Sequence, residues 1–374
     1  MRGPVISCAL VALATFGACA SRSDGIVQTH YGDFDAGASD GGAGSSDGGD
    51  PTDDDAGPAP TYPANAITFL VEPNGNKGGE LRAEIYAATK SVYMTMYTID
   101  DSAIIKAIEN RQAAGLDVKI VLDGSSQNKD FNRPAFDAFN AAVPGSAVWS
   151  SSDFAYTHQK TVILDGTEAW IMTMNLTYGA PRSYREYLAV DTVPADVAEA
   201  TAIFQADFAH TSITPTGDLV VADANAREKL VALIGTATTS LDLELEELTD
   251  TTSGGIVDSL VARANAGVKV RVVLANNDAA TATAVNAVKG AGGTVVTFGA
   301  DLGNATASNP YVAAKTILVD CSTGTCARGY VGSENMTANS LDNNRELGVI
   351  STDATELGKV YATVDLDAKA GTPR

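Results

Sequence analysis

The chain has 374 residues, 45% of them hydrophobic, so it is long enough to bury the core of one large domain or of two ordinary ones. Its formal net charge is −21 at pH 7. An acidic protein repels polyphosphate backbones, which argues against a nonspecific nuclease and makes nucleic acid an unlikely partner, although a local basic patch could survive inside that field.

The first 19 residues have the pattern of a bacterial export signal. Arg2 supplies a positive start, residues 5–16 are an apolar run, and small residues lead to Cys19. The run is too short to span a membrane permanently. A cysteine directly after Gly-Ala resembles a lipobox, in which Cys19 would be lipidated, while cleavage after Ala20 is the alternative. Both predict export, either as a lipoprotein of the bacterial outer membrane or cell surface or as a secreted protein.

Residues 20–64 are mainly Asp, Gly, Ser, Ala and Pro. This composition cannot bury enough apolar surface to order itself, so we expect a disordered acidic tether. Its root-mean-square span would be roughly 35 Å, enough to hold a globular domain off a bilayer surface to which the lipid anchors it. His30 lies in this segment, and we expect no role for it.

From residue 65 onward, apolar runs of strand length alternate with segments of helical period, and the pattern occurs twice. The first pass predicts strands over 67–71, 91–97 and 118–122, with helices over 80–89 and 102–114. The second pass predicts strands over 219–221, 240–245 and 268–274, with helices over 226–234 and 255–266. We therefore divide the folded part into a first repeat, 65–212, and a second repeat, 213–374.

The two passes stay aligned to their ends. The run from Lys160 to Asp165 matches the run from Lys315 to Asp320, Asn175-Leu-Thr matches Asn335-Met-Thr, and Arg185-Glu186 matches Arg345-Glu346. Such a duplication predicts an α/β fold in which two α/β units, each a mixed sheet with covering helices, pack as an intra-chain pseudo-dimer. One chain would then form a monomer with an internal pseudo-twofold axis.

Cys321 and Cys326 are the only cysteines of the folded part, and they flank Ser-Thr-Gly-Thr. In an oxidising compartment, two cysteines this close across a glycine-containing turn predict a local disulfide. The competing interpretation is a metal site, but no histidine lies nearby and two thiolates do not complete a zinc shell.

The segment around residue 160 contains the polar side chains with the most chemical content. His158 and Lys160 are two apart on a predicted strand, so both side chains should point to one face, while the later positions of the strand are apolar and enter the core. Asp165 then turns the chain into a returning strand over 168–174. We expect Asp165, and Asp320 at the matching position, to be structural rather than catalytic.

The full run of motifs resembles the phospholipase D superfamily, whose signature is His-x-Lys-x4-Asp followed by Gly-Ser-x-Asn and a downstream Glu. The resemblance covers nearly everything from Ala66 to the C-terminus and includes the duplicated architecture. It implies that the two motifs meet across the pseudo-twofold axis, where one histidine attacks phosphorus and the other protonates the leaving oxygen. It also implies that no metal or other cofactor is required.

Carried over residue by residue, the resemblance assigns the nucleophile or acid position to His158, the phosphate-binding lysines to Lys160 and Lys315, the amides to Asn175 and Asn335, and the acids that orient the imidazole or balance the lysines to Glu186 and Glu346. These residue types suit the chemistry. An imidazole can be a nucleophile or a proton carrier near neutral pH, and fixed cations and amides stabilise charge that develops on the phosphoryl oxygens.

The second motif departs from the family pattern, because Ala313 stands two residues before Lys315 where the family has its second histidine. His210 follows a helix predicted over 197–209, and we expect it at the helix end rather than in the cleft. The site should therefore contain one imidazole.

Two functions of different class follow. The first is an exported phosphodiesterase that hydrolyses phosphatidylcholine-like phospholipids through a phosphohistidine at His158, and export with a membrane anchor favours a lipid substrate. The alternative is a degenerate lipoprotein that binds phosphate head groups without turnover. A weaker alternative is an exported nuclease.

Overall fold

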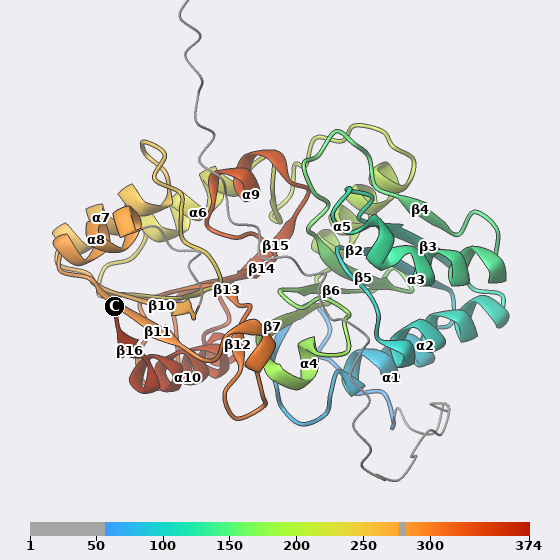
Figure 1. The fold of residues 1–374 in the computed structure, drawn as a ribbon, viewed down its shortest axis with the longest axis horizontal. Coiled ribbons are helices and arrows are strands. Elements are labelled where there is room, and N and C mark those ends of the chain that lie inside the picture. Colours follow the sequence, from blue (N-terminus) through green and yellow to red (C-terminus); the bar gives the residue numbers. More distant parts are fainter. Residues whose placement is uncertain (1–56, 277–281) are drawn as a thin grey trace, which may run out of the picture. The chain divides into compact units, whose positions relative to one another are not determined.

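The computed structural model describes residues 57–276 and 282–374 (Figure 1). The predicted export signal with Cys19, and residues 20–56 of the predicted tether with His30, lie outside the described residues and stay predictions. The end of the predicted tether already packs on the first repeat. The ring of Tyr62 meets the buried ring of Trp170 edge-on, with centroids 5.8 Å apart. Ordered structure therefore begins before residue 65.

The first repeat is a mixed sheet with covering helices, as predicted. Its strands run in the order β1-β7-β6-β5-β2-β3-β4; β2, β3 and β4 are parallel, and the other neighbours are antiparallel. The elements in chain order are β1 (Ile67–Glu72), α1 (Gly79–Ala87), β2 (Ser91–Met96), α2 (Ser102–Ala113), β3 (Asp117–Leu122), α3 (Lys129–Ala142), β4 (Ala147–Trp149), β5 (Lys160–Leu164), β6 (Glu168–Met172), α4 (Ala180–Ser183), β7 (Tyr184–Asp191) and α5 (Pro194–Phe208).

The second repeat has the same strand order, β8-β15-β14-β13-β9-β10-β11, extended at one edge by β16. Its elements are β8 (Val220–Val221), α6 (Ala226–Gly235), β9 (Ser240–Leu245), α7 (Ile256–Asn265), β10 (Lys269–Ala275), α8 (Ala282–Gly290), β11 (Thr294–Phe298), a 3₁₀ turn (Leu302–Asn304), β12 (Tyr311–Val312), β13 (Lys315–Val319), β14 (Arg328–Gly332), α9 (Ala338–Asn343), β15 (Leu347–Ser351), α10 (Ala354–Ala370) and β16 (Thr372–Pro373). The predicted duplication is confirmed.

One strand does not follow the division into repeats. β12 belongs to the second repeat in sequence, yet it pairs in parallel with β7 of the first sheet, Tyr311 opposite Tyr184 and Val312 opposite Arg185. A strand of two residues has too short a hydrophobic pattern to be read from sequence. It joins the two repeats by backbone hydrogen bonds next to the motif residues.

Local sequence explains why matching elements end at matching places. Helices α2 and α7 are both followed by a glycine in the left-handed region, Gly115 with φ 85° and Gly267 with φ 89°. Glycine adopts this conformation without the steric cost that a Cβ atom brings, so it can end a helix and turn the chain into the next strand. At the start of α2, the Asp101 carboxylate accepts the backbone N–H of Ala103 at 2.9 Å.

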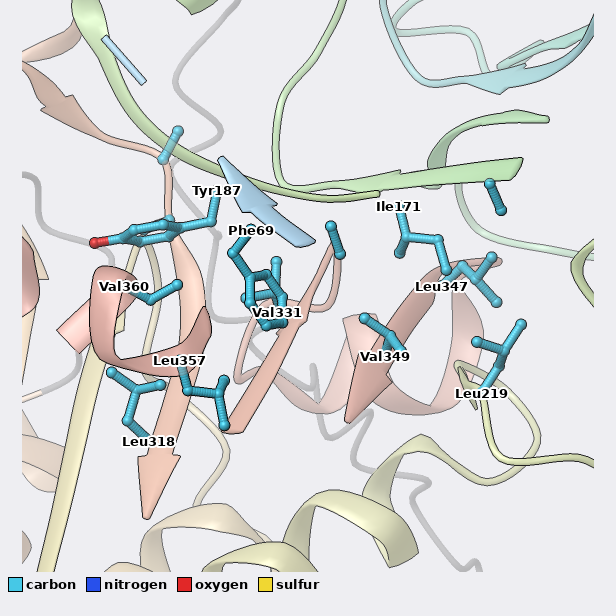
Figure 2. Close-up of a cluster of buried hydrophobic side chains, with 14 of the residues drawn as sticks. Phe69, Ile171, Tyr187, Leu219, Leu318, Val331, Leu347, Val349, Leu357 and Val360 are labelled. Atoms are coloured by element: carbon cyan, nitrogen blue, oxygen red, sulfur yellow. The ribbon is translucent and has the colours of Figure 1, made fainter. Parts of the chain in front are cut away.

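The two sheets share a buried core (Figure 2). The first sheet contributes Phe69, Ile171 and Tyr187; the second contributes Leu318, Val331, Leu347 and Val349; and α10 adds Leu357 and Val360. Burying each such side chain contributes about 1.5–3 kcal/mol. This apolar layer holds the two repeats together as the predicted intra-chain pseudo-dimer.

Asp165 and Asp320 have equivalent structural roles, as predicted. Both adopt the left-handed conformation, with φ 57° and 52°. Each carboxylate accepts three successive backbone N–H groups from the turn that precedes the second strand of its repeat: those of Thr89, Lys90 and Ser91 in the first, and of Thr238, Thr239 and Ser240 in the second. These residues therefore fasten the hairpin to the neighbouring strand and lie away from the motif lysines.

The hairpin between β13 and β14 is closed by the predicted disulfide, Cys321–Cys326. In the part of the chain that the structure describes, no helix is both long and apolar enough to cross a bilayer. Within the same residues, no group of three or more His, Cys, Asp or Glu side chains is arranged to hold a metal ion.

Candidate active site

His158 lies just before β5 and not on it, which differs from the predicted strand position. The segment leaves the first sheet because it pairs with the second repeat. Thr157 forms a parallel bridge with Arg345, and the Gln159 N–H donates to the Arg345 carbonyl at 3.0 Å. This pairing places the His158 ring next to Glu346, the residue that follows Arg345.

His158 and Glu346 form a hydrogen-bonded pair across the two repeats. The distance from His158 Nδ1 to Glu346 Oε2 is 2.7 Å. An ionised carboxylate can only accept, so Nδ1 carries the hydrogen and the lone pair is on Nε2. Glu346 is fully buried, and its other oxygen accepts the Ser340 hydroxyl and the Asn344 amide. The pair therefore fixes the tautomer that a nucleophile requires.

The charge states of this pair follow from its surroundings. Burial lowers the pKa of His158; Glu346 opposes this, and the two motif lysines add to it. The imidazole is therefore neutral at neutral pH, as a nucleophile must be. Burial would raise the pKa of Glu346, but His158 and Lys160 hold it below its ordinary value. Glu346 thus stays ionised.

Lys160 is buried between His158 and an aromatic ring. Its Nζ donates to the His158 carbonyl at 2.6 Å and lies 4.7 Å from the centroid of the Tyr97 ring, which also packs edge-on against the imidazole at 4.5 Å. Burial and the charge of Lys315 lower the pKa of Lys160 to about 7. No carboxylate bonds directly to this ammonium among the contacts of the described residues, so it can respond to a bound anion.

Lys315 has a different partner, which the sequence patterns did not predict. Its Nζ lies 2.5 Å from Glu246 Oε2 and donates to the Ala313 carbonyl at 2.7 Å. The Tyr311 hydroxyl donates to the other oxygen of Glu246 at 2.8 Å. Burial would lower the pKa of Lys315, but Glu246 raises it. Lys315 therefore stays protonated, and the negative charge of Glu246 offsets its positive charge.

Glu246 occupies the place of Tyr97 in the second repeat, because each is the first residue after the second strand, β2 or β9. The available signal was the alternation of acids with leucines in Leu241-Asp-Leu-Glu-Leu-Glu246. Alternation is the ordinary pattern of a half-exposed strand, so it did not mark the last acid as part of a site.

Ala313 lies next to Glu186 in register, because Val312 pairs with Arg185 as Thr157 pairs with Arg345 in the other half. Its N–H donates to the Arg185 carbonyl at 3.2 Å, next to the paired residues of β12 and β7. Glu186 is 1% exposed, and one of its oxygens accepts the Thr173 hydroxyl. Burial raises the pKa of Glu186 to about 8, although the lysines act against this. Glu186 is thus a neutral carboxylic acid at pH 7.

Asn175 and Asn335 are held in equivalent positions. The residue after each forms a parallel bridge near the end of the second strand of its repeat, Leu176 with Ile99 and Met336 with Leu248. The side-chain oxygen of both asparagines is buried without a hydrogen-bond partner among the residues described. The structure therefore places both amides at the strand ends that also carry Tyr97 and Glu246.

The comparisons with known proteins agree with the duplicated fold. The family model described as "Cardiolipin synthase, PLD-like domain" matches residues 81–208 and 230–365, one segment in each repeat. The chain belongs to the phospholipase D-like family.

Relatives and solved structures add detail. The chain is 28% identical over 132 residues to a phospholipase D of Rickettsia typhi, covering 34% of this chain and 54% of that protein. It is 30% identical over 113 residues to a phospholipase D of Rickettsia bellii, covering 29% and 51%. The phospholipase D-like chain thus spans about half the length of the curated relatives it matches.

Among solved structures, a phosphatidylserine synthase of Haemophilus influenzae aligns with a TM-score of 0.58 at 13% identity, covering 83% of this chain and 88% of that one. A polyphosphate kinase of Porphyromonas gingivalis aligns with a TM-score of 0.62 at 14% identity, covering 82% and 47%. Identities this low show the fold alone.

The other described histidine lies away from the pair in this phospholipase D-like site. His210 follows α5 with φ 52°, and its Nε2 donates to the Trp149 carbonyl at 2.8 Å on an exposed surface. It stands at the helix end, as predicted. Among the described residues, the motif site therefore contains His158 as its imidazole.

Proposed function

We propose that this chain is a phosphodiesterase of phospholipase D type in which His158 is the nucleophile. The observation that carries the proposal is the 2.7 Å bond between His158 Nδ1 and Glu346, which leaves the lone pair on Nε2. In the first step Nε2 bonds to phosphorus as the bond from phosphorus to the leaving oxygen breaks. In the second step water attacks the phosphohistidine and frees Nε2.

The phosphoryl oxygens need positive charge around them during both steps. Lys160 is the group best suited, because its ammonium lies beside the imidazole and bonds to a carbonyl rather than to a carboxylate. A bound phosphodiester would favour its charged form. The amides of Asn175 in the first repeat and Asn335 in the second would contribute further donors. Lys315 would add an N–H from the second repeat, although Glu246 offsets its charge.

We propose a phospholipid of the phosphatidylcholine class as the substrate, hydrolysed to phosphatidate and a free head group. The relatives named phospholipase D support this, as do the predicted export signal and the predicted lipid anchor at Cys19. The net charge of −21 weighs against nucleic acid. In this proposal the protein acts at a membrane surface outside the cytoplasm.

A second candidate is a head-group-binding protein without turnover. The observation that favours it is the second half of the site, where Ala313 supplies no imidazole and Lys315 is neutralised by Glu246. Loss of one general acid or base costs on the order of 10²- to 10⁴-fold in rate. An enzyme with a large total acceleration retains turnover after such a loss, and a weaker one does not.

The test compares the full chain with its His158→Ala variant on a nitrophenyl phosphodiester and on phosphatidylcholine vesicles. We expect release of nitrophenol and of choline by the wild type, both abolished in the variant, and a phosphohistidine trapped by rapid denaturation of the wild type alone. His210→Ala is the matched control and should retain activity. Equal background from wild type and His158→Ala, with vesicle binding preserved, would favour the binding protein.

A further inference from the structure

The two buried glutamates that follow the paired arginines are equivalent in position but not in environment. Glu346 accepts hydrogen bonds from His158, Ser340 and Asn344. Glu186 accepts one from Thr173, whose own oxygen accepts the Tyr187 N–H at 2.9 Å. Because donors stabilise the ionised form of a carboxyl, the glutamate with fewer of them is the easier one to keep protonated.

Backbone pairing places Glu186 where a carboxylate would hold a ring on residue 313. The bridge between Thr157 and Arg345 brings His158 beside Glu346. The pairing of β12 with β7, in which Val312 lies opposite Arg185, brings Ala313 beside Glu186 in the same way. A histidine at 313 would therefore stand next to Glu186, as His158 stands next to Glu346.

Charged groups from three other strands face the Glu186 carboxyl. Lys315 at the start of β13 and Lys160 at the start of β5 favour its ionised form, and Glu246 after β9 opposes it. Burial outweighs the lysines, so the pKa stands at about 8. Glu246 cannot play the same part, because Lys315 keeps it ionised. Of these two acids, Glu186 is the one with a proton to give at neutral pH.

We propose that Glu186 supplies the proton that the missing second histidine would otherwise deliver. This inference rests on the proposed phosphodiesterase function. Because alanine replaces the ring, the proton reaches the leaving oxygen through one bridging water: Glu186 gives its proton to the water, and the water gives one to the oxygen as its bond to phosphorus breaks. In the second step the Glu186 carboxylate takes a proton from the water that attacks phosphohistidine, which restores the starting state.

The test separates proton delivery from structure by changing only the leaving group. Vesicles contain either phosphatidylcholine, whose alkoxide leaving group needs a proton, or phosphatidyl-4-nitrophenol, whose leaving group departs without one. In the full chain, Glu186→Gln should lower turnover of phosphatidylcholine by about 10²-fold and turnover of the nitrophenyl lipid by less than about 3-fold. The wild-type rate on phosphatidylcholine should also fall above pH 8, and this decline should be absent in the variant.

Two matched variants serve as controls. Glu346→Gln disturbs the nucleophile, so both lipids should lose turnover together. Glu247→Gln removes the neighbouring half-buried acid, whose pKa burial raises to about 7, and it should affect neither lipid selectively. Equal losses on both lipids in Glu186→Gln would overturn the inference, as would a selective loss in Glu247→Gln alone. Nitrophenyl-lipid turnover that does not depend on His158 would instead defeat the proposed function.

Discussion

The two halves of the site use one backbone frame to hold two different electrostatic arrangements. In the first half-site, the Lys160 ammonium lies between His158 and Tyr97 and bonds to the His158 carbonyl. In the second half-site, the Lys315 ammonium bonds to the Ala313 carbonyl and also to the Glu246 carboxylate. The comparison shows that the lysine position alone does not define its role, because the residue after the neighbouring strand decides whether its charge is available to a ligand.

The difference also extends to the glutamates that serve each half. Glu346 is hydrogen-bonded to the His158 ring and stays ionised. Glu186 lies beside the methyl group of Ala313 and is protonated at neutral pH. The two glutamates therefore differ in protonation although they stand at matching positions of the two repeats. The following predictions test this comparison, in order of decreasing expected effect.

Replacing Glu346 should do the most damage. In Glu346→Ala, the His158 ring loses its fixed tautomer, and we expect turnover of the nitrophenyl lipid to fall by about 10²- to 10⁴-fold. Steady-state kinetics measures the loss, and thermal denaturation checks that the protein still folds without the partner of Ser340 and Asn344. Glu186→Ala on the same lipid is the comparison and should lose far less. Comparable losses would mean that the two glutamates are equivalent after all.

Restoring the second ring should make the halves more alike. In Ala313→His, the new imidazole would lie next to Glu186, which should become its ionised partner. We expect turnover of phosphatidylcholine to rise by about 10- to 10²-fold, with little change on the nitrophenyl lipid. The decline above pH 8 should move as Glu186 ceases to titrate there. No gain would indicate that the pair of Lys315 and Glu246 leaves the ring no productive position.

Removing the charge of Glu246 should release Lys315. In Glu246→Gln, the amide can still accept from Tyr311 but no longer neutralises the ammonium, so binding of inorganic sulfate should tighten by about 10-fold, or about 1.4 kcal/mol. Isothermal titration measures the affinity. Tyr97→Phe at the equivalent position of the first repeat is the matched control and should change it little. Unchanged affinity in Glu246→Gln would contradict the view that Lys315 is held out of use.

Sulfate affinity should also depend on pH through Lys160. Its pKa of about 7 is below the ordinary value, so the ammonium is charged below pH 7 and loses its charge above it. We expect binding to weaken by about 3- to 10-fold between pH 6 and pH 8.5, and most of this dependence should vanish in Lys160→Met. Sulfate is the suitable probe because, unlike phosphate, it does not itself titrate in this range. A flat profile in the wild type would contradict the shift.

The smallest effects concern the frame, in which the repeats should behave alike. Asp165→Ala and Asp320→Ala each remove an acceptor of three N–H groups and should lower the free energy of unfolding by about 1–2 kcal/mol without affecting turnover. Partial burial would raise the pKa of each carboxyl, but the donors around it lower it. Their contribution is therefore present above about pH 4 and is lost as the pH falls further. Urea denaturation should give matching values for the two variants.

Much of the fold could be predicted because local hydrophobic patterns indicate its strands and helices, and these patterns occur twice. The strands at Ser91–Met96 and Ser240–Leu245, and the aspartates that end β5 and β13, were visible as repeated runs. The motif residues followed from the same alignment. Local patterns could not place His158 before its strand, because pairing with Arg345 of the other repeat decides that. They likewise could not show that Glu246 neutralises Lys315, since 69 residues separate the two along the chain.

The pairing of β12 with the first sheet joins the two repeats within one chain, and this has a consequence for how the two half-sites can differ. In a symmetric dimer of a single repeat, one codon would specify the ring in both halves, and its loss would remove both at once. Once two copies are joined in one chain, with Tyr311 and Val312 paired to the sheet of the other copy, each copy can mutate separately. Position 313 could therefore change while His158 was retained. Two repeats joined in one chain thus allow the half-sites to differ, which a homodimer of a single repeat does not allow.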